Sequence, residues 1–215
     1  MKKINIKHMV TLAMLTAMAY ALVCLIRIPV VVFLKYEPKD VVITIGGLLF
    51  GPTAALIISA VTALLEMVSI SDTGIIGAVM NLLSSCAFAC TASFIYKKRR
   101  TLSGAVLGLA AGSVMMVGAM LLWNWLVTPL YMGVPREVVT GMLIPTFLPF
   151  NLLKAGLNSA LVLCLYKPLV NALRKAGLIR PTQEKSTGSK VGLYLFAGAL
   201  LVTCILFLLV LRGIL

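Results

Sequence analysis

The chain has 215 residues, of which 61% are hydrophobic and only 12% are charged, and its formal net charge is +13. This composition excludes an ordinary soluble domain, and the length accommodates six or seven membrane spans of about 20 residues each. The positive charge does not indicate a nucleic-acid partner, because the basic residues lie in short segments between apolar runs, which is the positive-inside pattern of proteins in a lipid bilayer.

The first half of the chain predicts four hydrophobic spans. The first span ends before Pro29, and a polar loop over residues 33–40 follows it. The second span is short and ends at Gly51-Pro52, and the fourth is stopped by the basic run 97–100. We expect these spans over residues 9–28, 41–51, 53–69 and 75–96.

The second half of the chain predicts two more core spans and one additional helix. The core spans cover residues 104–128 and 145–170, and a loop reaching to residue 142 separates them. We therefore expect an all-α integral membrane protein with a six-helix core and a seventh, C-terminal transmembrane helix. Its parts are a membrane domain over 1–170, a basic linker over 171–190 and the extra helix over 191–215.

The basic clusters predict the orientation of the chain. They lie before the first span, after the fourth at 97–100, and after the sixth between Lys167 and Lys190. If the N-terminus is cytoplasmic, all three clusters fall inside the cell after an even number of crossings. The loops 33–40 and 129–142 then lie outside. We expect a multi-pass protein of the cell membrane with a cytoplasmic N-terminus.

The reactive residues argue against an enzyme. The one histidine, His8, cannot form the paired-histidine helix of a zinc protease, and the sequence has no G-x-x-x-x-G-K-[ST] phosphate loop. The five cysteines lie within apolar runs, without further soft ligands at metal spacing, so we interpret them as small hydrophobic residues. The sequence thus predicts no catalytic residue, no metal and no cofactor.

Polar side chains inside the apolar spans are the strongest functional signal. A lysine in hydrocarbon costs about 2.5–3.5 kcal/mol on insertion scales, so Lys154 should face a protein-lined or wet cavity. Asn151 lies three residues earlier and shares its helix face. Two alternatives stay open, namely that such amides join helices and that Lys154 forms a structural ion pair with Glu66. The other amides at this depth are Asn81, Asn124 and Asn158.

Several segments resemble a known family when they are taken together and in order. The run Leu34-Lys-Tyr-Glu-Pro-Lys-Asp40, followed by the short span ending at Phe50-Gly-Pro52, is similar to the first outer loop and second helix of the substrate-binding S components of energy-coupling factor (ECF) vitamin transporters. Glu66 and the run 73–81 resemble the loop before the fourth helix and the start of that helix. The likeness covers residues 8–170.

The later segments resemble the riboflavin-specific branch of these S components. They are Asn124 and the run Pro149-Phe-Asn-Leu-Leu-Lys154, which Asn158 follows. Two features depart from the family pattern: Lys39 stands where a small polar residue is commoner, and a seventh span follows the usual six.

The resemblance implies a vitamin-binding subunit. Such a subunit binds its vitamin in a cavity near the outer face, capped by the loop after the first helix. It docks on a membrane coupling subunit, the T component, that carries two cytoplasmic ATPases. Ala13 and Ala17 match the family's A-x-x-x-A docking motif, and small residues one turn apart let a partner helix approach closely. Internal packing is the alternative for these two alanines.

Riboflavin is the transported ligand that the resemblance implies. Its flat, largely apolar ring and its hydroxyl-rich tail suit an apolar pocket with a few placed polar groups. The alternatives are an S component for thiamine, pantothenate or folate and, more distantly, an integral-membrane enzyme. The substrate-binding residues that the resemblance implies are Leu34, Glu66, Met67, Asn81, Asn124, Trp125, Asn151 and Lys154.

Overall fold

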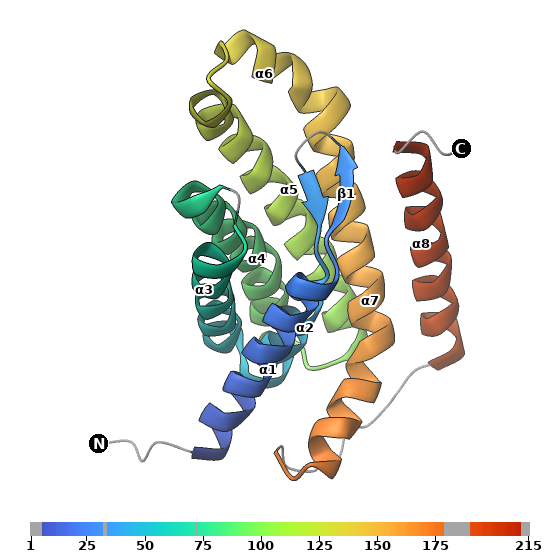
Figure 1. Cartoon of the computed structure of the whole chain (residues 1–215). Helices are drawn as coiled ribbons and strands as arrows, with labels where there is room; N and C mark the ends of the chain where they lie inside the picture. The colour runs from blue at the N-terminus through green and yellow to red at the C-terminus, as the bar shows by residue number, and fades with distance from the viewer. Residues whose placement is uncertain (1–5, 32–33, 72, 179–189, 212–215) are drawn as a thin grey trace.

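The computed structural model describes residues 6–31, 34–71, 73–178 and 190–211. Helices form an elongated bundle, and a two-stranded hairpin lies toward one end of it (Figure 1). In chain order the elements are α1 (Ile6–Leu25), β1 (Ile28–Val31), β2 (Leu34–Tyr36), α2 (Lys39–Phe50), α3 (Pro52–Ser69), α4 (Gly74–Lys98), α5 (Leu102–Met132), α6 (Arg136–Met142), the π-helix η1 (Leu143–Phe147), α7 (Leu148–Lys175) and α8 (Lys190–Leu211).

Six helical runs among the described residues are long and apolar enough to cross a membrane. Five of them are α1, α3, α4, α5 and α8, and the sixth is the continuous run Arg136–Lys175 through α6, η1 and α7. The predicted all-helical membrane fold is therefore confirmed. The remaining core helix, α2, has only 12 residues, or about 18 Å, which is too short for a hydrocarbon layer of about 30 Å.

The short helix α2 lies inside the bundle. Ten of its residues are buried, including the charged Lys39 and Asp40 of its first turn. It packs against α1, α3, α4 and α7. Because neighbouring helices enclose α2 so completely, its two charged residues must find their partners within the protein.

The two predicted outer loops contain more regular structure than we expected. Residues 28–31 and 34–36 pair as antiparallel strands with an irregularity between Pro29 and Val31, and the predicted loop had covered only the second strand. The predicted loop 129–142 is mostly helical, because α5 continues through Pro129 to Met132 and α6 begins at Arg136. Gly133, with a φ of 65°, makes the left-handed turn that ends α5.

Close helix contacts shape the middle of the bundle. A Cβ built on Gly108 of α5 would lie 2.7 Å from the carbonyl oxygen of Ala92, and one on Gly112 would lie 2.6 Å from that of Phe88. Since only glycine fits at both positions, α5 approaches the backbone of α4 more closely than side chains would allow.

The ends of the bundle differ in charge. The start of α1, the connection between α4 and α5 and the C-terminal end of α7 all lie at one end of the molecule (Figure 1). Lys7, the run 97–100 and Arg174 therefore gather at this end, as the basic clusters of the sequence predicted. The hairpin and α6 lie toward the opposite end, which we call the hairpin end.

Candidate functional site

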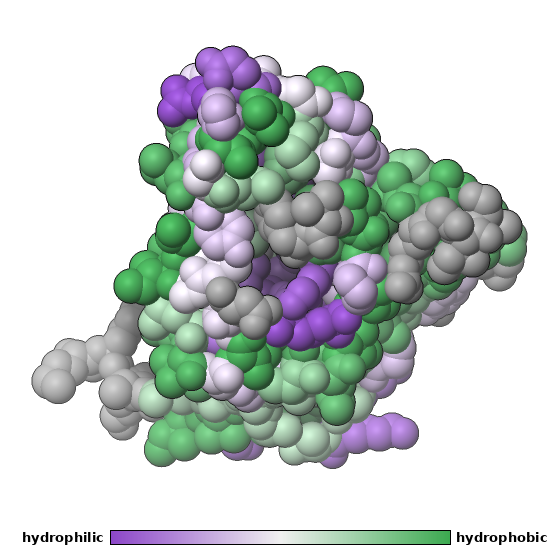
Figure 2. All heavy atoms as spheres, turned by 45° about the horizontal axis from the view of Figure 1, so that its top comes forward, coloured by the Kyte–Doolittle hydropathy of each residue, from purple (hydrophilic) through white to green (hydrophobic). Residues whose placement is uncertain are grey.

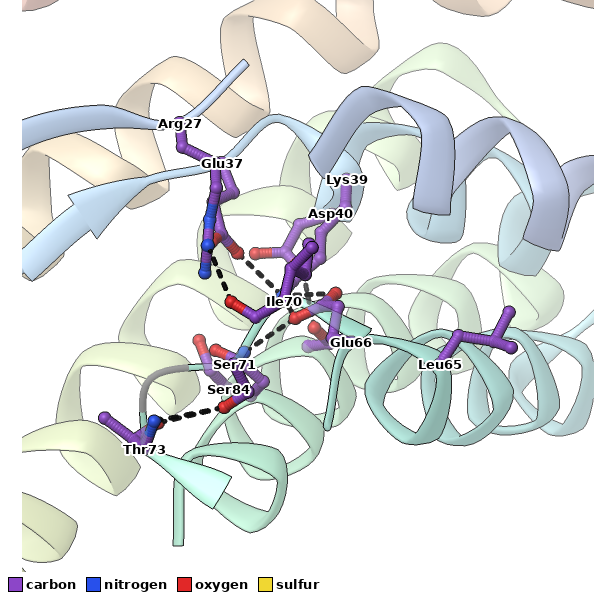
Figure 3. Close-up of polar contacts among 12 residues, drawn as sticks. Arg27, Glu37, Lys39, Asp40, Leu65, Glu66, Ile70, Ser71, Thr73 and Ser84 are labelled. Atoms are coloured by element: carbon purple, nitrogen blue, oxygen red, sulfur yellow. Dashed lines mark hydrogen bonds and ion pairs between the residues drawn. The ribbon is translucent and has the colours of Figure 1, made fainter. Parts of the chain in front are cut away.

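The first turn of α2 anchors a buried ionic network near the hairpin end. Lys39, which is only 1% exposed, places its Nζ 2.6 Å from Oε2 of Glu66 on α3 and 2.8 Å from Oε2 of Glu37 (Figure 3). Arg27 pairs with Glu37 at 2.9 Å, and Asn81 of α4 donates to Glu66 at 2.8 Å. This network connects the end of α1, the hairpin, α3 and α4.

A second group of polar contacts begins at the neighbouring residue, Asp40. Its Oδ2 lies 3.1 Å from Nζ of Lys154 on α7, and Asn158 of the same helix donates to it at 3.3 Å. Lys154 also donates to Oγ of Ser84 at 3.1 Å, while the hydroxyl of Tyr36 in β2 donates to Oδ1 of Asn158 at 3.0 Å. Adjacent residues of α2 therefore pair with different helices, Lys39 with α3 and Asp40 with α7.

The charges within these two groups balance. Every charged side chain in them has an opposite charge within 3.1 Å, as burial in the bundle requires. The alternative that Lys154 pairs with Glu66 is wrong, because Lys154 forms its ion pair with Asp40 and Glu66 forms its ion pair with Lys39. The three positive members are Arg27, Lys39 and Lys154, and the three negative members are Glu37, Asp40 and Glu66.

Glu37 lies between β2 and α2 and is ionised in this setting. Burial alone would raise the pKa of its carboxyl, but the charge and hydrogen bond of Lys39, with contributions from Lys154 and Arg27, lower that pKa below its usual value. The ionised carboxylate contacts Arg27 and Lys39 at once, so it ties the hairpin to the start of α2.

An apolar cleft opens beside the network, between the start of α4 and the end of α5. It spans about 320 Å³ of non-atom space, a figure that includes space open to solvent. Asn81, whose amide binds Glu66, lies one helical turn after Gly77 of the lining, so the cleft and the network adjoin along α4. The lining residues are Thr73, Ile76, Gly77, Met80, Trp123, Val127, Thr128 and Tyr131.

The surface at the hairpin end has both hydrophilic and hydrophobic areas. Figure 2 shows hydrophilic residues gathered in the middle of this face, with hydrophobic residues around them. A ligand that has both an apolar ring and polar groups would find complementary chemistry on this face.

None of the eight predicted substrate-binding residues is in the lining of the cleft. Leu34, Glu66, Asn124, Asn151 and Lys154 are buried, and Met67 and Asn81 are half-buried. Trp125 lies outside the cleft: it is 37% exposed, and the guanidinium of Arg136 sits 4.8 Å from its ring centre. Trp123 lines the cleft instead. The spacing of four from Trp123 to Val127 and on to Tyr131 is the sequence signal that would have identified this wall.

The buried amides play two different roles. Asn124 and Asn151 donate to carbonyl oxygens of their own helices, Met120 at 2.7 Å and Phe147 at 2.8 Å. Asn81 and Asn158 instead bind carboxylates on neighbouring helices. The helix-joining interpretation therefore fits Asn81 and Asn158, whereas Asn124 and Asn151 keep polar atoms for other partners.

The two alanines of the predicted docking motif point away from the bundle. Ala13 and Ala17 are exposed, while Leu12, Leu15 and Ala19 of the same helix are buried in the core. Internal packing, the alternative interpretation of this motif, therefore does not describe these two positions.

Comparison with known proteins defines the class. The sequence model of the family described as ECF transporter, substrate-specific component, matches residues 7–166, and the chain belongs to this family. A solved structure of the S component of a bacterial ECF transporter has a TM-score of 0.67 and 28% sequence identity with it. That similarity covers 80% of this chain and 99% of the solved one. The chain is thus a transporter subunit and not an enzyme.

Two similar proteins share a stated substrate. The riboflavin transporter RibU of Staphylococcus aureus (strain TCH60) is 28% identical over 187 residues, which covers 81% of this chain and 97% of RibU. The riboflavin transporter FmnP of Bacillus subtilis (strain 168) is 25% identical over 187 residues, covering 80% of this chain and 98% of FmnP.

Proposed function

We propose that this chain is the riboflavin-binding subunit of an ECF vitamin transporter in the cell membrane. The observation that carries the proposal is the buried ionic network of Lys39 and Glu66, which adjoins an aromatic-lined cleft through Asn81, in a family member whose similar proteins RibU and FmnP are riboflavin transporters. The subunit binds the vitamin from outside the cell and delivers it by docking on a T component with two cytoplasmic ATPases.

The charge balance of the site favours a neutral ligand. Because Asp40 already neutralises Lys154, a bound molecule need not supply a counter-charge. A vitamin with a carboxylate would instead gain most from an unpaired cation, and Arg27, Lys39 and Lys154 all have carboxylate partners. This observation supports riboflavin over folate and pantothenate.

The remaining groups suit a flavin. Trp123 and Tyr131 offer aromatic surface to a flat ring, and rings of this kind gain free energy from offset or edge contacts. The oxygen of Asn151 and the second N–H of Asn124 would supply an acceptor and a donor for polar atoms. Leu34 and Met67 would provide apolar contact, and Asn81, which lies one turn after Gly77 of the cleft, would act together with Glu66.

The exposed face of α1 is the proposed docking surface for the T component. The basic end of the bundle gives the proposed orientation of the chain in the membrane. Ala13 and Ala17 form an exposed small-residue surface on which a helix of the T component can lie closely. The basic end of the bundle faces the cytoplasm under the positive-inside rule, so the N-terminus is cytoplasmic and the hairpin end is outside.

The absorption spectrum of the detergent-purified protein tests the ligand. Protein from cells supplied with riboflavin should carry flavin absorption bands that follow the protein through gel filtration. A folded protein that carries no flavin, takes none up on addition and retains thiamine, pantothenate or folate would show that the ligand is a different vitamin.

A further inference from the structure

The helix α8 lies beyond the family match, which ends at residue 166, and the solved S component has no counterpart for about a fifth of this chain. It packs along α7 and against β1 (Figure 1). We infer that α8 braces the hairpin against α7 and thereby slows the release of the bound ligand. The identity of that ligand rests on the proposed function.

Among the α8 side chains that the structure describes, the buried ones lie on one narrow face. Ala197 and Cys204, two turns apart, are buried. Their neighbours Val202 and Leu206 are 57% and 50% exposed. The two buried residues lie at different heights along the helix and belong to different hydrophobic clusters. Ala197 joins the core of the bundle with residues such as Val162, and the outer half of α8 contacts the hairpin.

The outer half of α8 belongs to the same hydrophobic cluster as the hairpin. The cluster combines Val30, Leu34 and Tyr36 of the hairpin with Cys204, and Leu208 packs against it. From α7 it contains Phe150, Leu153 and Leu157. One set of apolar contacts therefore joins α8, the hairpin and the first turns of α7.

α7 and α8 approach each other closely beside the ionic site. A Cβ built on Gly156 would lie 2.6 Å from Sγ of Cys204, so a larger residue at position 156 would displace the Cys204 side chain. Gly156 lies between Lys154 and Asn158, the two residues of α7 that contact Asp40. α8 thus contacts the segment of α7 whose side chains bind Asp40.

The outer half of α8 covers part of the hairpin. Strand edges facing lipid leave backbone groups without partners, and non-helical backbone is tolerated only where protein or water surrounds it. β1 lies beside the outer half of α8, which supplies apolar protein surface there. Tyr36 of β2 also donates to Asn158, so a hairpin that opens gives up contacts with both α8 and α7.

Two matched pairs of full-length variants test the brace. Leu208→Ala removes a contact with the cluster, and Leu206→Ala makes the same change on the exposed face. Cys204→Trp cannot fit against Gly156, and Val202→Trp places the same ring in lipid. The measurements are the dissociation rate of riboflavin, from recovery of flavin fluorescence, and hydrogen exchange of residues 28–36.

Leu208→Ala and Cys204→Trp should speed flavin release about tenfold, a change within the reach of a lost or overpacked core contact, and should speed exchange of the hairpin amides. The two exposed-face controls should match the wild type. Unchanged release and unchanged exchange in folded Leu208→Ala protein would overturn the brace. If the wild type binds no riboflavin, the proposed function fails, while hydrogen exchange of the hairpin still decides whether α8 braces it.

Discussion

Asp40 and Lys154 form a 3.1 Å ion pair that connects the first turn of α2 with α7. Asp40 is fully buried, and it also accepts hydrogen bonds from Ser85 and Asn158. Removing one member of a buried pair is far more costly than removing both, because the remaining charge is left without a partner in a poorly solvated site. The pair therefore explains how a lysine is tolerated at this depth, and it makes the site electrically neutral.

The pair predicts a specific pattern in a double-mutant cycle. Asp40→Asn should destabilise the protein by about 3–5 kcal/mol, because it leaves Lys154 uncompensated. Adding Lys154→Met should recover part of that loss, so the double variant melts above the level that the two single changes predict together. Thermal melting in one detergent measures all three variants. Strictly additive effects would mean that the two charges do not interact.

The stability of the protein should also depend on Lys39, which pairs with Glu37 and Glu66. Lys39→Met should lower the melting temperature markedly, because Glu37 and Glu66 would then lie close together without the cation that contacts both. Lys97→Met removes an exposed lysine at the opposite end of the bundle and serves as the control. Equal melting temperatures for the two variants would show that the Lys39 pairs contribute nothing to stability.

The helices were predictable because hydropathy is a local property. The predicted span 53–69 corresponds to α3 at Pro52–Ser69, and the predicted span 75–96 to α4 at Gly74–Lys98. A cost for burying Lys154 also follows from its immediate surroundings in the sequence. The length of a hydrophobic run and the free-energy cost of a buried charge can both be read from the sequence without knowing which helices are neighbours.

The pairing of the charges was not predictable in this way. Lys39 and Asp40 stand in a segment that reads as a polar loop, yet their partners are Glu66, 27 positions away, and Lys154, 114 positions away. Only the packing of α2 between α3 and α7 decides which carboxylate meets which ammonium. The choice between Trp123 and Trp125 likewise depends on how α5 is rotated against α4.

Asn151 should contribute to flavin binding more than to folding. Within the described part of the chain, its amide donates to the carbonyl of Phe147 one turn earlier and to no other helix, so Asn151→Ala should leave the melting temperature nearly unchanged. In the complex, the lost partner should cost about 1–3 kcal/mol, or roughly tenfold in affinity. Asn171→Ala, an exposed change on the same helix, is the control. Wild-type affinity in Asn151→Ala protein would remove this residue from the site.

Ala17 should affect transport without affecting binding. Ala17→Trp places a large ring on the exposed face of α1, where a partner helix must approach closely. Uptake by cells and copurification with the T component and ATPases should fall, while flavin binding by the isolated subunit stays normal. Val114→Trp, at a 73% exposed position of α5, should change neither property. Normal copurification and uptake in Ala17→Trp cells would exclude this docking face.

The most direct test of the whole account is a titration of ligand-free purified protein with riboflavin, followed by flavin fluorescence. The account predicts saturable quenching at one flavin per chain, since flavin emission is lost when the ring stacks on aromatic side chains such as Trp123 and Tyr131. It also predicts that excess thiamine, pantothenate or folate does not displace the flavin. The absence of quenching by folded protein, together with saturable binding of one of those other vitamins, would contradict it.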